Sequence, residues 1–558
     1  MMPCDRFGLS DAARPRGVSV PARSGAGALA SSTQEEHVAQ LLFDLAEKLR
    51  NSPALVDERG TTDWTQFNRR VNQLMAGFEA AGLKENDTIA ILSENRREYY
   101  ECMAAATHSG LRYVPVNWHW VPEEVAYVLE NSDAQALLAG GQFSDLAAET
   151  LARDDCPQLR LTVSMAENVP EGMQDYEEWI ASYPDDEPEK SSLGGPMFYT
   201  SGTTGRPKGV VSGSFSGEDK PVALMSLVGQ AITGTLGLPE NGRTLLIGPV
   251  YHSAQWAFSY LPLLAGTAVV MRHGFDAADT LRLIDQHQIT NSHLVPTQFV
   301  RLLRLDEKTR SEFDGSSLVA IWHGAAPCSS KVKRDMIDWW GPIVWEYYGS
   351  TESAIISTIS AEDWLEHPGS LGKPLESVEV RVVKTDGSLA QPGEEGQLYF
   401  RSQMGTDFEY HKDPKKTEEA HLEPGVFSVG DIGYMNAEGY LFMSDRKIDM
   451  IISGGVNIYP AEIEGVLVSH DAIADAAVFG VPNEEFGEEV KASVELSPDV
   501  EASEQLAEEI REYCREHLAG YKVPRSVDFE ESLPRHPTGK LYKRILRDRY
   551  WEGHERRI

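Results

Sequence analysis

The feature that most constrains the fold is an alternation of strand-like and helix-like segments that begins near residue 32. Residues 267–271 are apolar and strand-like, Asp276 can cap the helix that follows, and residues 292–295 read as the next strand. Residues 318–345 repeat this arrangement of strand, helix and strand. Repeated βα units predict an α/β fold, with parallel-rich sheets covered by helices.

Length and local composition predict several parts. A chain of 558 residues is too long for one hydrophobic core. Residues 1–31 are small and rich in Pro and Gly, which predicts a disordered tail. Residues 32–444 are expected to form a large N-terminal domain, which from residue 397 becomes an antiparallel β subdomain of short strands and turns. Residues 445–558 predict a small α+β C-terminal domain.

Charge and cysteine usage exclude several function classes. The chain has 51 Lys and Arg against 86 Asp and Glu, a net charge of −35, which argues against a nucleic-acid partner. Its five cysteines form no CxxC pair, so neither a disulfide framework nor a zinc site is indicated, and a cytoplasmic location is expected. Residues 244–271 carry no charge, but interrupting Gly, Pro and His residues favour a buried core over a transmembrane segment.

The sharpest local motif is YTSGTTGRPKGV at residues 199–210. Its glycines allow tight turns, its hydroxyls and exposed N–H groups can surround an anion, and its lysine adds a point charge suited to phosphate. It lacks the Gly-Lys-Ser/Thr triplet of a Walker A loop. The residues predicted to bind phosphate are Thr200, Ser201, Gly202, Thr203, Thr204 and Lys208.

This loop resembles the phosphate loop of the adenylate-forming superfamily, which includes acyl-CoA synthetases, peptide-synthetase adenylation domains and luciferases. Further motifs follow in the family's order between about residues 35 and 550, and the closest resemblance is to bacterial fatty-acyl and steroid-acid CoA ligases. The resemblance implies ATP, Mg²⁺ and coenzyme A as ligands. It also implies that the C-terminal domain is mobile, with a hinge at residues 445–448.

Several other motifs resemble the family's nucleotide site. In YYGSTE at residues 347–352, the resemblance assigns Glu352 to Mg²⁺ and Thr351 to the α-phosphate. In FSVGD at 427–431, Asp431 is assigned to the two ribose hydroxyls. The remaining residues that the resemblance places around the nucleotide or coenzyme A are Gly324, Ala325, Ala326, Pro327, Tyr347, Tyr348, Gly349, Arg446, Gly454 and Gly455.

The resemblance also assigns the acid pocket and the catalytic lysine. His252, in PVYHS at 249–253, corresponds to the aromatic motif that closes the acyl site, and Lys540 corresponds to the lysine that promotes adenylation. The expected catalytic residues are therefore Lys540, Thr200, Glu352 and His252. The expected substrate pocket is formed by His252, Trp256, Val295, Trp322, Gly324 and Gly349.

The implied function is an AMP-forming acyl-CoA synthetase, an acid–thiol ligase that makes an acyl-adenylate and then a thioester. A fatty or other aliphatic acid is predicted, while aryl, steroid and sulfur-containing acids stay open. The alternatives are an adenylating enzyme that does not use coenzyme A, a luciferase-like oxygenase, and a non-catalytic acyl-AMP sensor. Intact Lys540, Glu352 and Asp431 disfavour the sensor. A homodimer is left open.

Overall fold

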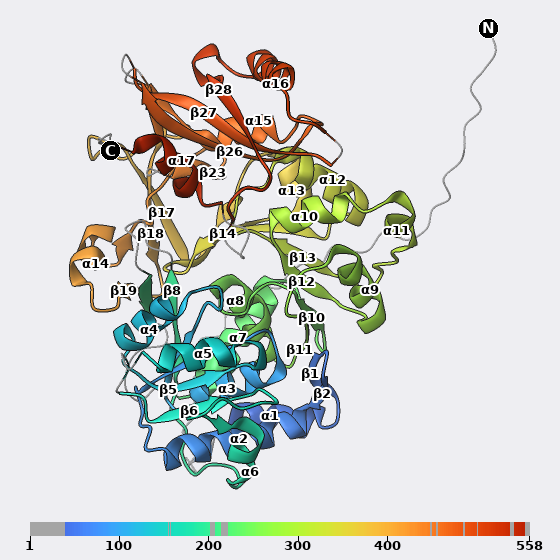
Figure 1. Ribbon diagram of the computed structural model, residues 1–558, viewed down its shortest axis with the longest axis vertical. Coiled ribbons are helices and arrows are strands. Elements are labelled where there is room, and N and C mark those ends of the chain that lie inside the picture. The colour runs from blue at the N-terminus through green and yellow to red at the C-terminus, as the bar shows by residue number, and fades with distance from the viewer. Residues whose placement is uncertain are drawn as a thin grey trace, which may run out of the picture. The chain divides into compact units, whose positions relative to one another are not determined.

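The computed structural model describes residues 40–153, 156, 158–200, 207–213, 221–446, 449–453, 456–483, 486–498, 500–535 and 541–552. The strands of these residues form four sheets (Figure 1). The predicted tail, residues 1–31, lies outside the described residues.

The first sheet has eight strands in the order β19-β9-β8-β4-β3-β5-β6-β7. These strands are β3 (Thr88–Leu92), β4 (Arg112–Pro115), β5 (Ala134–Ala139), β6 (Leu161–Ser164), β7 (Gln174–Asp175), β8 (Gly195–Thr200), β9 (Lys208–Ser212) and β19 (Phe408–Tyr410). Strands β4, β3, β5 and β6 pair in parallel, whereas the β8–β9 hairpin and β19 are antiparallel.

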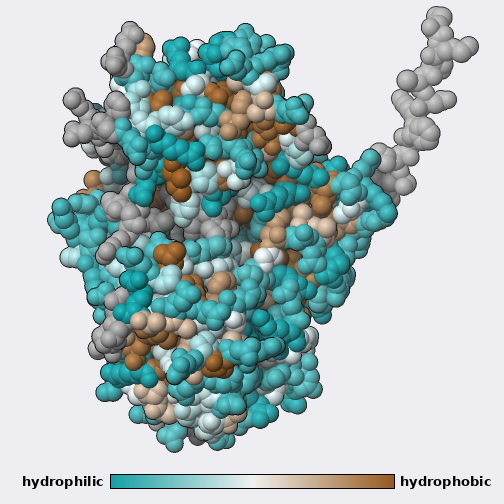
Figure 2. Space-filling view, in the orientation of Figure 1, coloured by the Kyte–Doolittle hydropathy of each residue, from teal (hydrophilic) through white to brown (hydrophobic). Residues whose placement is uncertain are grey.

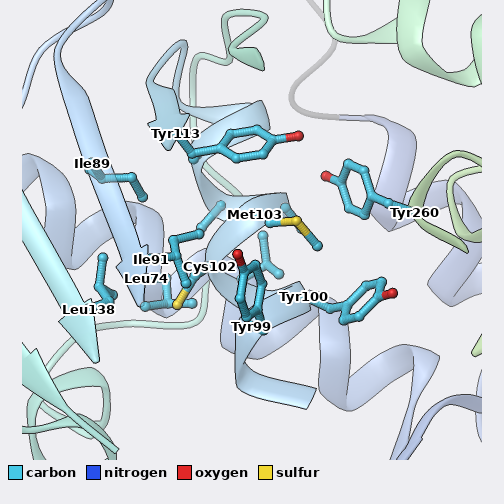
Figure 3. Close-up of a cluster of buried hydrophobic side chains, with 14 of the residues drawn as sticks. Leu74, Ile89, Ile91, Tyr99, Tyr100, Cys102, Met103, Tyr113, Leu138 and Tyr260 are labelled. Carbon is cyan, nitrogen blue, oxygen red and sulfur yellow. The ribbon is translucent and has the colours of Figure 1, made fainter. Parts of the chain in front are cut away.

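Every residue of β3 is buried, because helices cover both faces of this sheet. Ile89 and Ile91 belong to the core on the side of α2 (Trp64–Ala80), α3 (Arg97–His108) and α6 (Tyr176–Ala181). Figure 3 shows part of this core, in which the side chains of Tyr113 and Tyr260 point toward one another. The alternate residues of β3 face α4 (Pro122–Asn131) and α5 (Ser144–Leu151).

The second sheet has nine strands in the order β16-β15-β14-β13-β12-β10-β11-β1-β2. They are β1 (Pro53–Asp57), β2 (Gly60–Asp63), β10 (Arg243–Leu246), β11 (Ala268–Met271), β12 (Asn291–Leu294), β13 (Ala320–His323), β14 (Val344–Ser350), β15 (Ala354–Ile359) and β16 (Lys373–Pro374). The strands from β11 to β14 pair in parallel, as the repeated βα units predicted.

The helices predicted beside this sheet are also present. Asp276 caps α9 (Ala277–His287) by accepting the N–H of Asp279 at 2.7 Å. The second predicted helix is α12 (Ser330–Trp340). The remaining helices before residue 446 are α1 (Gln40–Leu49), α7 (Ala223–Thr235), α8 (Ser253–Leu263), α10 (Pro296–Leu303), α11 (Glu307–Glu312), α13 (Ala361–Glu366) and α14 (Pro414–Ala420).

The third sheet is antiparallel, as predicted for the segment after residue 397. Its strands are β17 (Val378–Val383), β18 (Gly396–Ser402), β20 (His421–Glu423), β21 (Val426–Phe427), β22 (Asp431–Met435) and β23 (Leu441–Arg446). One short strand of this region, β19, pairs instead with β9 of the first sheet.

The fourth sheet and three helices form the smaller C-terminal part. The strands are β24 (Ile451–Ser453), β25 (Val456–Ile458), β26 (Ile473–Asn483), β27 (Gly487–Leu496) and β28 (Ser526–Glu530). The helices are α15 (Pro460–Leu467), α16 (Glu504–His517) and α17 (Lys543–Trp551). The predicted fold class, a large α/β part with an antiparallel subdomain followed by a small α+β part, is confirmed.

The uncharged stretch at 244–271 folds into β10, α8 and β11. None of the helices that the structure describes is both long and apolar enough to cross a bilayer. The face shown in Figure 2 is largely hydrophilic, with hydrophobic residues in scattered patches, which agrees with the large excess of acidic residues.

Candidate active site

The predicted phosphate loop connects β8 to β9, and its two ends are described. Thr200 ends β8 and pairs directly with Lys208, the first residue of β9. Ser201, Gly202, Thr203 and Thr204 lie outside the described residues. The hairpin therefore places Thr200 and Lys208, the residues that flank the loop, opposite one another at the end of the strand pair.

Tyr410 joins the phosphate loop to the predicted metal ligand. It pairs with Val210 because β19 lies along β9, and its ring centroid is 5.5 Å from Lys208 Nζ. Its hydroxyl donates to Glu352 Oε1 at 3.1 Å. Burial, helped by the nearby Lys416 ammonium, lowers the pKa of Lys208 to about 8. A partly desolvated lysine and a carboxylate are thus held on either side of one tyrosine.

Glu352 lies in the tight turn between β14 and β15. Ser350 pairs with Ala354 across this turn, and Ala354 has a φ of +57°, a left-handed conformation that is uncommon for a residue with a side chain. Thr351, in the same turn, has its Oγ1 2.8 Å from Ser253 Oγ at the start of α8. The turn therefore contacts both the phosphate side of the site and the motif that contains His252.

The two tyrosines of the YYGSTE motif face different parts of the site, since successive residues of a strand point to opposite faces. Tyr348 donates its hydroxyl to Asp431 Oδ2 at 2.5 Å, and Asp431 is only 2% exposed. Asp431 in turn pairs across the sheet with Arg446, of which only the backbone is described. Residues predicted to bind adenosine, although far apart in sequence, are thereby brought together.

Tyr347 turns the other way, and its ring lies against the backbone of Gly324. A Cβ at Gly324 would sit 2.4 Å from that ring, so only glycine fits there. The next residue, Ala325, has a φ of +64° and is exposed, while Pro327 is exposed two residues later. The segment from Gly324 to Pro327, which includes Ala326, follows β13 at its carboxyl end, as an α/β ligand site requires. Gly349 is needed for a similar reason, because a Cβ there would lie 2.0 Å from the Ala354 carbonyl oxygen.

A small cavity of about 10 Å³ lies among the carboxyl ends of β10, β12 and β13, and has room for about one water molecule. Two predicted pocket residues, His252 and Val295, line it. His252 precedes α8 and accepts the N–H of Ala254 through Nδ1 at 3.3 Å. The other lining residues are Gly248, Pro249, Gln255, His293, Gln298 and Ala325.

Trp256, which the sequence analysis expected in the acid pocket, does not line this cavity. Trp256 is buried in the core beside the first sheet, where its Nε1 donates to the Tyr113 hydroxyl at 2.9 Å and its ring contacts Phe198. The physical reason is helical geometry: Trp256 lies about 100° around α8 from Gln255, which faces the cavity. Trp322 does not line the cavity either; it stacks on Trp345 with ring centroids 5.3 Å apart.

Part of the predicted site belongs to segments outside the described residues. Gly454, Gly455 and Lys540 lie outside the described residues, as do Lys447 and Ile448 of the predicted hinge. The chain passes from β23 to the C-terminal sheet between Arg446 and Ile451. The mobile C-terminal domain therefore stays a prediction, as do the boundaries at residues 31 and 444.

Comparison with known proteins decides the family. A family model described as AMP-binding enzyme matches residues 42–406, which is well over half of the chain, and a model described as AMP-binding enzyme C-terminal domain matches residues 462–540. The chain belongs to the AMP-binding enzyme family. The predictions of an adenylate-forming protein and of an AMP-forming ligase are therefore confirmed.

Relatives of this AMP-binding enzyme differ in the acid for which they are named. The 2-succinylbenzoate–CoA ligase of Bacillus licheniformis is 33% identical over 506 residues, covering 90% of this chain and 98% of that protein. The long-chain-fatty-acid–CoA ligase FadD13 of Mycobacterium tuberculosis is 30% identical over 491 residues, covering 87% and 93%. The crystal structure of the anthranilate CoA ligase AuaEII in complex with anthranoyl-AMP superposes with a TM-score of 0.83 at 25% identity, covering 93% and 98%.

Three buried residues that support the site were not predicted from the sequence. Asn95 donates through Nδ2 to the carbonyls of Gly248 and Arg272 at 2.7 and 2.8 Å, and accepts the N–H of Val250 at 3.0 Å. It thus fixes the loop that leads to His252. A polar residue just after the buried strand at 88–92 was the available signal.

Lys333 and Glu346 form a buried ion pair at 2.6 Å that was also not predicted. The Lys333 side chain is completely buried, and its ammonium lies 4.7 Å from the centroid of the Trp364 ring. Glu346 directly precedes the two tyrosines of β14. This pair anchors α12 to the strand that supplies both sides of the site.

Proposed function

We propose that this AMP-binding enzyme is an acyl-CoA ligase. It activates a carboxylic acid with ATP to acyl-AMP, releasing pyrophosphate, and then transfers the acyl group to coenzyme A, releasing AMP. The observation that carries the proposal is the contact of Tyr410 with both Lys208 and Glu352, which joins the phosphate loop to a carboxylate. Two relatives, 33% and 30% identical across nearly their whole length, are named CoA ligases.

In the first half-reaction the chain's own groups orient ATP and neutralise charge. Asp431, already held by the Tyr348 hydroxyl, would accept the ribose hydroxyls, while Thr200 and Lys208 would contact the phosphates. Attack of the carboxylate on the α-phosphorus brings two anions together, so positioned donors and cations contribute most of the catalysis. Lys540 is proposed to supply the cation at the point of attack.

The residues present fit a magnesium ion. Mg²⁺ is usually held by one or two carboxylates together with substrate phosphates, and Glu352 has one carboxylate oxygen bonded to Tyr410 beside the phosphate loop. Glu352 would hold the ion, which when bound neutralises phosphate charge. Among the residues that the structure describes, no cluster of three or more His, Cys, Asp or Glu side chains forms an all-protein metal site, which agrees with this assignment.

The second half-reaction is proposed to require a rotation of the C-terminal domain about residues 445–448. Rotation would withdraw Lys540 and bring the segment of Gly454 and Gly455 to the pantetheine arm of coenzyme A. Hinged closure of this kind is a common switching mode. A cytoplasmic location and the oligomeric state stay predictions.

The relatives do not narrow the proposal to one class of carboxylic acid. Relatives of similar identity are named for an aryl acid and for long-chain fatty acids, so the fatty acid predicted from the sequence has no advantage over an aryl acid. We therefore propose a carboxylic acid without assigning it to either class on the basis of the relatives.

The test is a panel of carboxylic acids supplied with ATP, Mg²⁺ and coenzyme A, with pyrophosphate, AMP and thioester measured separately. We expect equal amounts of all three products with at least one acid. Glu352→Gln should lower pyrophosphate release by roughly a hundredfold, as expected when one charged group is lost at a phosphoryl site. The matched control is Glu409→Gln, an exposed glutamate beside Tyr410, which should leave the rate unchanged. Pyrophosphate release without thioester would overturn coenzyme A as the acceptor.

A further inference from the structure

Two lysine ammonium groups lie close together beside the phosphate loop. Lys208 begins β9 at the end of the loop, and Lys416 belongs to α14. Burial and a side-chain contact with the Lys416 ammonium lower the pKa of Lys208 to about 8. Both side chains are only partly buried, so a solute can still reach them. The adenylation chemistry proposed above assigns no role to Lys416.

The fold fixes Lys416 in this position through α14 and β19. Thr417, the next residue, accepts the backbone N–H of Tyr410 at 2.9 Å through its Oγ1. Asp413 Oδ1 accepts the backbone N–H of Lys416 at 3.1 Å. Because β19 pairs with β9 through Tyr410, the start of α14 is held beside the strand that follows the phosphate loop. The contact between the two lysines therefore follows from the pairing of these strands.

The acidic side chains that act on Lys208 from α14 are engaged elsewhere. These are Asp413 and Glu419. The Asp413 carboxylate caps α14, and the Glu419 carboxylate lies 3.7 Å from Lys415 Nζ. Among the described residues, no carboxylate lies within ion-pair distance of the Lys208 or the Lys416 ammonium group. Two adjacent cations without a counter-ion repel one another, and an anion bound between them offsets that repulsion.

The order of contacts across the nucleotide side indicates which anion fits. Asp431, which is proposed to hold the ribose, contacts β14. Glu352 lies in the turn that ends β14 and contacts Tyr410, whose ring centroid is 5.5 Å from Lys208 Nζ. Lys416 contacts Lys208, so it lies at the opposite end of this series from the ribose residue. The β- and γ-phosphates are the part of ATP most remote from the ribose, and they carry most of its negative charge.

We propose that Lys416 is a further phosphate-binding residue, which with Lys208 holds the β- and γ-phosphates of ATP and then the departing pyrophosphate. The inference rests on the proposed function, since ATP is taken as the substrate. When the carboxylate attacks the α-phosphorus, the bond from that phosphorus to the oxygen of the β-phosphate breaks. The bonding electron pair leaves with that oxygen, so pyrophosphate gains negative charge. Two ammonium groups beside the departing group stabilise this charge as it develops.

The experiment compares Lys416→Gln with Lys415→Gln in calorimetric binding of Mg·ATP, Mg·pyrophosphate and AMP to the full chain. Lys415 is the matched control, because it is adjacent on the same helix, its side chain is 85% exposed and it pairs with Glu419. We expect Lys416→Gln to weaken the binding of ATP and of pyrophosphate roughly tenfold, the effect of one lost hydrogen bond to a charged group. AMP lacks the two outer phosphates and should bind as before. Lys416→Arg should restore most of the loss, and Lys415→Gln should bind all three ligands like the wild type.

Two outcomes would overturn the inference. If Lys416 only repels Lys208, its removal raises the pKa of Lys208, and Lys416→Gln binds ATP more tightly or equally well. An equal loss of AMP binding would mean that the substitution disturbs the site in general. Calorimetry needs no acid, so the role of Lys416 is decided even if no acid yields pyrophosphate and the proposed function fails. A wild-type chain that binds neither ATP nor pyrophosphate would contradict both.

Discussion

The nucleotide side and the acid side of the site are built differently. On the nucleotide side, single hydrogen bonds connect residues from different sheets, such as Tyr348 of β14 with Asp431 of β22, and Tyr410 of β19 with Glu352 in the turn after β14. Beside the small cavity next to His252, where the acid is proposed to bind, Gln255, His293 and Tyr347 come from a helix and two strands, and aromatic rings support them. The nucleotide side presents charged and hydroxyl groups suited to ATP, which is the same ligand in every turnover. The other side presents a cavity wall of defined shape with a set of hydrogen-bonding groups.

This difference suggests which residues would determine the choice of acid. ATP makes the same demands in every turnover, and the residues proposed to bind it belong to short, contiguous motifs. We expect the acid to be recognised by packing between elements that are far apart in sequence, so that one substitution there would change selectivity without touching the phosphate chemistry.

The largest effect is expected when the buried ion pair of Lys333 and Glu346, which supports both sides of the site, is broken. Lys333→Met breaks the buried pair with Glu346 and leaves its buried carboxylate with only His323 Nε2 of the described residues, 3.8 Å away, which should lower the free energy of unfolding by about 3–5 kcal/mol. The measurement is urea denaturation followed by tryptophan fluorescence. Lys331→Met is the control, because its pair with Asp335 on the same helix is exposed and should contribute less than about 1 kcal/mol. Similar losses in both variants would show that burial of the pair has no consequence.

Trp256→Ala tests whether Trp256 lies outside the acid pocket. Because Trp256 packs in the first core and bonds Tyr113, its truncation should reduce stability by about 3–5 kcal/mol while the order of preferred acids stays the same. Thermal unfolding and a panel of acids measured at low temperature check the two halves of the prediction. A shift of substrate preference toward bulkier acids would show that Trp256 lines the acid pocket.

Lys540→Ala should separate the two half-reactions. Loss of its ammonium group should slow adenylation by roughly a hundred- to a thousandfold, or about 2.7–4 kcal/mol. The same variant should still convert synthetic acyl-adenylate and coenzyme A to thioester at nearly the normal rate, because the proposed rotation withdraws Lys540. Single-turnover assays measure each step. Equal losses in both steps would argue against the rotation.

Asp431→Asn tests whether the two sides are energetically independent. Hydrogen bonds to a charged group contribute about 1.5–3 kcal/mol, so the KM for ATP should rise roughly ten- to a hundredfold. The KM for the acid should change less than about twofold. Parallel increases in both constants would mean that the nucleotide side and the acid side act as one unit.

The smallest expected effect is a pH dependence on the nucleotide side. The pKa of Lys208 is lowered to about 8 by burial and by Lys416, against the opposing charges of Asp413 and Glu419. The ammonium form binds phosphate, so the KM for ATP should increase as pH rises from 7 to 9. Lys208→Arg keeps its charge throughout this range and should flatten the profile. A profile that is unchanged in this variant would assign the titration to another group.

The structure brings the residues predicted for the nucleotide together more fully than those predicted for the acid, for a physical reason. Asp431, Glu352 and Lys208 lie in contiguous motifs whose residue types follow from ribose, metal and phosphate chemistry. Gln255 meets His293 38 residues away, and Asn95 meets Arg272 177 residues away, so no local pattern contains these contacts. Helical spacing alone does not reveal that Gln255, and not its neighbour Trp256, lines the small cavity.

The pairing of β19 with β9 also has a consequence for how the chain is made. Tyr410 pairs with Val210, so the edge of the first sheet is covered by a strand that leaves the ribosome 200 residues later. At about 5–20 residues per second, that edge would stay uncovered for roughly 10–40 s during synthesis. An open strand edge is a template for unwanted pairing with other chains. A chain that ends before residue 408 would keep this edge open permanently, directly beside the phosphate loop.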